Sequence, residues 1–78
     1  MNRYVATFHT HLSAMLSCRA LTAAGICARM APVPRAVSSS CGTCVVYTHE
    51  DPARSCLDED AEAVYEQRGN QYHTVLIF

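Results

Sequence analysis

The chain has 78 residues, half of them hydrophobic, with six basic and seven acidic residues and a formal net charge of −1. This length allows one small domain, residues 1–78, and the near-neutral charge argues against nucleic-acid binding, which needs a basic field. It also argues against a polybasic membrane anchor, and no apolar run approaches the roughly 20 residues that a membrane-spanning helix needs.

The first half of the chain predicts a strand followed by a helix. Residues 3–8 alternate between two faces, as a half-buried strand does. Thr10 can cap a helix, and the Ala-, Leu- and Met-rich segment 11–24 favours that helix. Gly25 then provides a typical helix end.

The second half predicts two further strands, a helix and a last strand. The strands are expected at 26–33 and 43–48, the second of them rich in β-branched residues. Pro52 begins a segment whose apolar residues recur every three or four positions, which predicts a helix up to Arg68. Gly69 and Asn70 end that helix, and residues 71–78 form the fourth strand.

This β-α-β-β-α-β order predicts a ferredoxin-like split βαβ fold of the α+β class. We expect a four-stranded antiparallel sheet in the order 4-1-3-2, with both helices on one face. The other face would then expose apolar side chains of the last strand, a patch that monomers usually avoid. A homodimer or another partner is therefore expected on the open sheet face.

The most unusual stretch lies between the second and third strands and runs from Pro32 to Gly42. Its two prolines keep the backbone extended, and its three serines favour a turn. Gly42 permits a positive φ or the close approach of another group. The sequence therefore predicts a thiol, Cys41, held on a shaped loop.

The expected topology also predicts which side chains share one end of the sheet. That end would collect basic groups around the loop thiol, namely His9, His11, Arg35 and Arg68, together with Ser38, Ser39, Ser40 and Gly42. The acidic start of the second helix, with Asp51 and Asp58, would lie at the opposite end beside His49 and Cys27.

Three stretches of the chain resemble the selenium/sulfur (Se/S) carrier protein-like domain family. They are Tyr4–His11, Leu21–Ile26 and, most specifically, the run Pro-Val-Pro-Arg-Ala-Val-Ser-Ser-Ser-Cys-Gly from Pro32 to Gly42. The resemblance implies a ferredoxin-like carrier or binding domain in which Cys41 matches the family's cysteine before glycine.

The five cysteines at positions 18, 27, 41, 44 and 56 are odd in number and irregularly spaced, unlike a disulfide framework. A reducing, cytoplasmic location is the simpler interpretation. Cys41 and Cys44 form a C-x-x-C match, but Cys44 falls inside the third strand and is expected to pack in the core. Cys18, Cys27 and Cys56 are interpreted as buried small apolar residues or incidental thiols.

The sequence therefore predicts a small carrier of sulfur or selenium. Cys41 would hold the chalcogen, Arg35, His9 and His11 would stabilise the anion, and Ser38, Ser39 and Ser40 would shape the pocket. Donor and acceptor proteins are the expected partners; no cofactor and no complete set of catalytic groups is expected. The alternatives are a metal- or ligand-binding module, whose metal would use Cys41, Cys44, His9 and His11, and a ferredoxin-like interaction domain without chemistry of its own.

Overall fold

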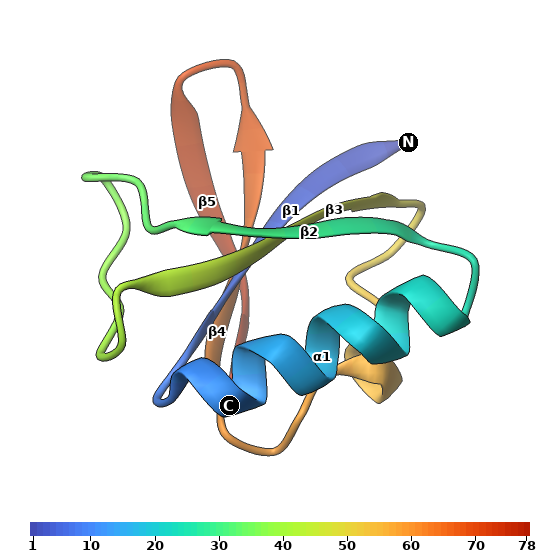
Figure 1. Ribbon diagram of the computed structural model, residues 1–78. Coiled ribbons are helices and arrows are strands. Elements are labelled where there is room, and N and C mark those ends of the chain that lie inside the picture. Colours follow the sequence, from blue (N-terminus) through green and yellow to red (C-terminus); the bar gives the residue numbers. More distant parts are fainter.

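The computed structural model describes all residues from 1 to 78 as a five-stranded antiparallel sheet with one α-helix packed on it (Figure 1). The strand order is β2-β3-β1-β4-β5. In chain order the elements are β1 Asn2–Phe8, α1 His11–Ala23, β2 Cys27–Pro32, β3 Thr43–His49, the 3₁₀ turn η1 Arg54–Cys56, β4 Ala61–Arg68 and β5 Gln71–Ile77.

The predicted ferredoxin-like fold is therefore wrong in the second half of the chain. The segment expected to be a second helix forms the short turn η1 and the strand β4, and β4 lies between β1 and β5. The expected neighbours β2, β3 and β1 do pair as predicted. The molecule is mostly β, with one helix on one face of the sheet.

A β-bulge explains why the sequence of β4 imitates a helix. Phe8 pairs with Ala61 and Thr7 pairs with Ala63, so Glu62 is an extra residue in β4 without a partner in β1. A bulge of this kind reverses the alternation of the strand locally. Ala61 and Val64 therefore both reach the helix-side core although they are three residues apart, the spacing of a helical stripe.

The hairpin turn between β4 and β5 reverses the chain where the helix was expected to stop. Arg68 pairs with Gln71, and Gly69, with φ of +60°, occupies the first of the two turn positions. A glycine there is the requirement of a two-residue type II′ hairpin turn. The Gly-Asn pair is thus a hairpin signal, which competes with its interpretation as a helix end.

The helix α1 begins and ends where the sequence indicates. The Thr10 hydroxyl accepts a hydrogen bond of 3.2 Å from the Ser13 amide, which satisfies one free donor of the first turn. At the other end the amide of Ile26 donates to the Leu21 carbonyl at 3.0 Å, while Gly25 adopts φ of +82°. These contacts form a Schellman motif, which turns the chain directly into β2.

The main core lies between α1 and the sheet. Each of the four strands from β1 to β4 contributes side chains to this layer, and α1 covers it with Ala14 and Leu21. The turn η1 closes the layer beside the helix, because the buried Ser17 hydroxyl of α1 accepts a 2.8 Å hydrogen bond from the Asp58 amide. The Tyr47 hydroxyl also donates to the Pro52 carbonyl, and together these bonds fix the segment before β4.

The centre of the other sheet face is buried within a single chain. Val5, Thr7 and Cys44 share this face by register, and each is at most 1% exposed. The expected apolar patch is therefore confined to β5, where Ile77 is 75% exposed and Val75 is 38% exposed. Among the helices of this fold, none has the length and apolar character of a membrane-spanning segment.

Ala63 tests the corrected fold, because a helix with the predicted stripe would leave this position outside its apolar face. In the structure Ala63 is buried and faces Thr7 across the sheet. We expect Ala63→Lys to lower the free energy of unfolding by at least about 2 kcal/mol, since it places an unpaired charge in a buried position. Gln71→Lys, at an exposed position of β5, should change it by less than about 0.5 kcal/mol.

Urea denaturation followed by circular dichroism measures both variants. Equal, small effects of the two substitutions would contradict the placement of Ala63 inside the sheet.

Candidate functional site

The two ends of the loop from Val33 to Gly42 are hydrogen-bonded to each other, and a turn bends its tip. The Val33 amide donates to the Gly42 carbonyl at 3.2 Å, which extends the β2–β3 pairing by one step. The Val37 amide donates to the Pro34 carbonyl at 3.0 Å, which forms a turn around Arg35. Val37 itself is only 6% exposed, so this loop residue anchors the tip against the body of the protein. Gly42 has φ of +74°, the left-handed conformation that glycine adopts without strain.

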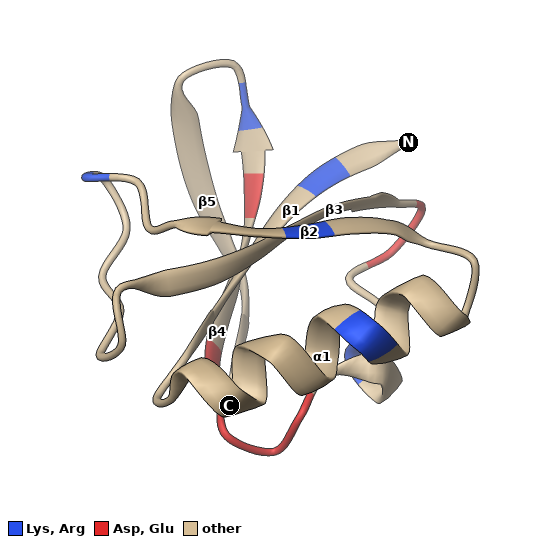
Figure 2. Ribbon diagram, viewed as in Figure 1, with Lys and Arg blue, Asp and Glu red and all other residues tan.

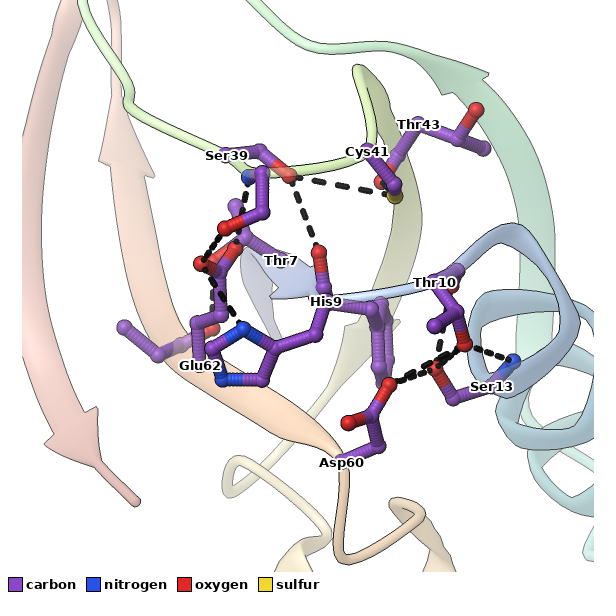
Figure 3. A network of polar contacts seen from close by, with 12 residues as sticks. Thr7, His9, Thr10, Ser13, Ser39, Cys41, Thr43, Asp60 and Glu62 are labelled. Atoms are coloured by element: carbon purple, nitrogen blue, oxygen red, sulfur yellow. Dashed lines mark hydrogen bonds and ion pairs between the residues drawn. The ribbon is translucent and has the colours of Figure 1, made fainter.

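Cys41 is half-buried at the returning end of this loop (Figure 3). Its Sγ donates to the Thr43 carbonyl at 3.3 Å and lies 3.9 Å from the Ser39 hydroxyl. The Ser39 hydroxyl in turn donates to the carbonyl of Phe8, at the end of β1, at 3.2 Å. The side chain of Cys41 also packs against the helix-side core. The thiol is therefore held in place rather than projecting freely into solvent.

Glu62, the bulged residue of β4, ties the loop to the sheet. Its carboxylate accepts two hydrogen bonds from Ser40, one from the hydroxyl at 2.6 Å and one from the amide at 3.2 Å. The same carboxylate lies 3.5 Å from Nδ1 of His9. A dashed line joins the two side chains in Figure 3. Partial burial raises the pKa of Glu62, but the bonds from Ser40 and the charge of His9 outweigh it, so the net pKa lies below its usual range.

A second carboxylate, Asp60, joins the loop before β4 to the start of α1. It accepts hydrogen bonds from the Ser13 hydroxyl at 2.6 Å and the Thr10 hydroxyl at 3.0 Å (Figure 3). The bond from Ser13, followed by that from Thr10 and the charge of His9, lowers the pKa of Asp60. On the other side of the helix start, Nδ1 of His11 lies 3.4 Å from the Thr43 hydroxyl.

The structure brings several of the predicted site residues to one end of the sheet. His9, His11, Ser39, Ser40, Cys41 and Gly42 meet there through the contacts given above. No hydrogen bond or ion pair joins either imidazole to the Cys41 thiol. Each histidine contacts another residue instead. His9 lies against Glu62, and His11 lies against Thr43, whose carbonyl accepts from Cys41.

Other predicted members of this group lie elsewhere. Arg35 and Ser38 are exposed near the loop tip and make no side-chain hydrogen bond or ion pair. Arg68 lies at the far end of β4, where the strand pairs with the first residues of β1, and it binds Glu66 at 3.1 Å. The expected clustering of Arg68 with the thiol is wrong because β4 is a strand antiparallel to β1 and not a helix.

The expected separation of charges is wrong for Asp60 and Glu62. Figure 2 shows acidic positions at the start of β4 and in the loop before it, beside the beginning of α1. Glu62 and Asp60 are thus part of the site that the sequence predicts to be basic. A strand prediction for residues 61–68 would have placed Glu62 beside Phe8 and hence beside the loop.

Cys44 belongs to a different environment from Cys41. It is fully buried, and its Sγ lies 3.7 Å from the Pro32 carbonyl. Burial raises the pKa of the Cys44 thiol, with an opposing contribution from Arg29 and a further rise from Cys41. Cys44 therefore packs as a core residue of β3, as the sequence predicts.

The alternative metal site is not assembled. The structure gathers no group of three or more His, Cys, Asp or Glu side chains that could hold a metal ion. Of the four proposed ligands, Cys44 is enclosed in the sheet, while His9 and His11 are engaged with Glu62 and Thr43. The donor set Cys41, Cys44, His9 and His11 is thus dispersed over separate contacts.

Comparison with protein families gives one match, which covers most of the chain. The model of the family described as "Putative Se/S carrier protein-like" matches residues 3–66, from β1 into the second half of β4. The matched range includes the whole 33–42 loop and both carboxylates of the site. No curated protein and no solved structure gives a significant match.

The lowered pKa of Glu62 predicts a pH-dependent attachment of the loop. A carboxyl whose folded-state pKa is depressed stabilises the fold at a pH above its unfolded value and loses that contribution as the pH falls through the folded value. We expect Glu62→Gln to lower the free energy of unfolding by about 1.5 kcal/mol at pH 7, the size of a hydrogen bond to a charged group. The difference from wild type should shrink as the pH falls through the lowered pKa of Glu62, where the wild-type carboxyl also becomes neutral.

Urea unfolding between pH 3 and pH 7 measures this difference. Glu59→Gln, which removes an exposed carboxylate without a side-chain contact, serves as the matched control. A gap between wild type and Glu62→Gln that stays constant down to pH 3 would show that the charge of Glu62 does not hold the loop.

Proposed function

Because the chain belongs to the Se/S carrier protein-like family, we propose that it holds sulfur or selenium on Cys41 and passes it to a partner protein. The observation that carries this proposal is the position of Cys41. It is the one cysteine of five that lies on the 33–42 loop, and a network of hydroxyls and a carboxylate surrounds it. All five thiols are free, which fits the proposed reducing, cytoplasmic setting.

Loading can proceed by exchange with a donor persulfide. The Cys41 thiolate attacks the terminal sulfur of the donor, a new sulfur–sulfur bond forms, and the donor's own sulfur–sulfur bond breaks. The bonding electrons leave on the donor thiolate, and the proton stays on the transferred sulfur. No net oxidation occurs, and the reverse exchange with an acceptor thiolate delivers the atom. Selenium would follow the same path as a selenosulfide.

Access to the thiol requires a small movement of the loop. Cys41 donates to the Thr43 carbonyl and packs against the core, so a donor sulfur reaches it only when this contact opens. Ser39 and Ser40 tie the same stretch of loop to Phe8 and Glu62. These two attachments would set how often the thiol is presented, which gives the serines a role as positioning residues.

The other predicted site residues would play separate parts in the transfer. His9 and His11 lie at the same end of the sheet and supply ionisable protons near the loop without contacting Cys41 in the resting arrangement. Arg35 and Ser38, on the exposed tip, would meet the surface of a donor or acceptor protein. We also propose a second copy of the chain as a possible binding partner at β5, where Ile77 is exposed.

Substitution of single cysteines tests the assignment of the carrier thiol. In protein that also carries Cys27→Ser, which removes an exposed thiol, Cys41→Ser should abolish the mass increase of one sulfur that persulfide treatment adds, because the attacking sulfur is gone, and should keep the fold. Cys44→Ser should keep loading while lowering the free energy of unfolding by about 1–3 kcal/mol, since a fully buried hydroxyl replaces a weakly polar thiol.

Mass spectrometry of intact protein and of its peptides, prepared without reductant, gives both readouts. Cys56→Ser is the matched control, a half-buried thiol away from the loop, and should load like wild type. Loading that persists in folded Cys41→Ser protein would overturn the assignment of Cys41. Equal loss in Cys41→Ser and Cys44→Ser would point instead to a pair of cooperating thiols.

A further inference from the structure

A hollow lies on the sheet face opposite α1, away from the Cys41 site. It has a volume of about 170 Å³ and is lined by residues of β1, β2 and β3: Arg3, Cys27, Ala28, Arg29, Val46, Tyr47 and Thr48. The strand register explains its composition. Arg3 and Cys27 both pair with Thr48, and Arg29 pairs with Val46, two residues before Thr48 in β3. Residues two apart in a strand share a face, so these side chains point to the same face of the sheet.

The hollow carries positive charge without a balancing carboxylate. None of the seven acidic residues lines it. The only ion pairs in the molecule are His9 with Glu62 and Arg68 with Glu66, so neither Arg3 nor Arg29 is engaged by an acidic group. Two guanidinium groups that face one concavity form a site for an anion, because each can donate two parallel hydrogen bonds to an oxyanion.

Cys27 gives the same hollow a reactive group. Its side chain is exposed, so of the two expectations for this cysteine, a buried small residue or an incidental thiol, the structure excludes the buried residue. By register Cys27 lies two residues from Arg29 on β2, and Thr48 of β3 separates it from Arg3. A reaction at a thiol depends on access, and nearby cationic groups attract anionic reagents to it. Cys27 meets both conditions, whereas Cys44 on the same face is enclosed.

We propose that this hollow binds a small anionic molecule through a carboxylate or inorganic oxyanion group held by Arg3 and Arg29. The thiol of Cys27 lies beside the bound anion and reacts preferentially with thiol-reactive molecules that carry such a group. The volume is below the range of about 300–1,000 Å³ that is usual for drug-sized ligands, which favours a small acid over a nucleotide.

This site is separate from the proposed carrier thiol. Cys27 and Thr48 pair at one end of the β2–β3 ladder, whereas Pro32 and Thr43 pair at the end next to Cys41. Five residues of extended strand separate the two ends, which is about 17 Å. The anion site does not depend on the carrier function, and each can fail without the other.

Two alkylating reagents that differ in charge test the proposal. In both, the thiolate of Cys27 displaces iodide, but iodoacetate carries a carboxylate and iodoacetamide is neutral. Peptide mass spectrometry gives the rate of each reaction at Cys27 in Cys41→Ser protein, which removes the carrier thiol. We expect the iodoacetate-to-iodoacetamide rate ratio to fall about threefold in Arg3→Gln or in Arg29→Gln, from Coulomb attraction at about 6 Å in water, and about tenfold in the double variant.

Four controls keep the result specific to the site. Arg19→Gln removes an exposed arginine of α1 and should leave the ratio unchanged, and Arg29→Lys, which keeps the charge, should preserve most of it. Cys44 should stay unmodified in every variant, because its alkylation would report unfolding. Sodium sulfate should slow iodoacetate at Cys27 more than sodium chloride of the same ionic strength does.

A ratio that is the same in wild type and in the folded double variant would overturn the site. A sulfate effect fully reproduced by chloride would likewise show general screening and no bound anion.

Discussion

The fold and the site both depend on one extra residue in β4. Glu62 has no partner in β1, and this bulge turns Ala61 and Val64 toward the helix while Ala63 faces the other way. It also directs the carboxylate of Glu62 to the end of the sheet where Cys41 lies, and there it binds Ser40 and lies beside His9. Bulges commonly re-aim a side chain near functional sites. Without it, β4 would still pair with β1, but the 33–42 loop would lose its attachment to β4 and keep the Ser39 bond to Phe8.

The sequence predicts the first half of this molecule well, because its signals there are local. Thr10 and Gly25 mark the ends of α1, and the loop with Cys41 lies between two paired strands as expected. The second half is predicted wrongly, because the bulge gives a strand the apolar spacing of a helix. The Gly69-Asn70 pair instead indicates a hairpin turn, and the structure has that hairpin between β4 and β5. Glu62 reaches the site because β4 is a strand paired with β1. The expected helix over this segment therefore could not predict that the site contains this carboxylate.

The two thiols that the structure makes available stand at opposite ends of the same strand ladder and in opposite electrostatic settings. Cys41 is half-buried beside the Ser39 hydroxyl and follows Ser40, which binds the Glu62 carboxylate, whereas Cys27 is exposed and lines a hollow with Arg3 and Arg29. A carboxylate near a thiol disfavours the approach of small anions, so the proposed carrier thiol would suit exchange with a protein partner that docks on the loop. The exposed Cys27 thiol would instead favour small anionic reagents. The two proposed sites would therefore select different classes of reactant.

The position of β4 in the sheet has a consequence for how the chain folds. The hairpins β2–β3 and β4–β5 each join segments that are close in sequence, and α1 forms between β1 and β2. The β1–β4 ladder, in contrast, joins the first strand to a segment near the other end of the chain. Pairings over such separations form slowly, because the entropy of closing the loop is lost before the contacts form. The docking of the β4–β5 hairpin onto β1 should therefore be the late step of folding. Since Glu62 arrives with that hairpin, the hydrogen bonds that tie Ser40 of the Cys41 loop to β4 form last.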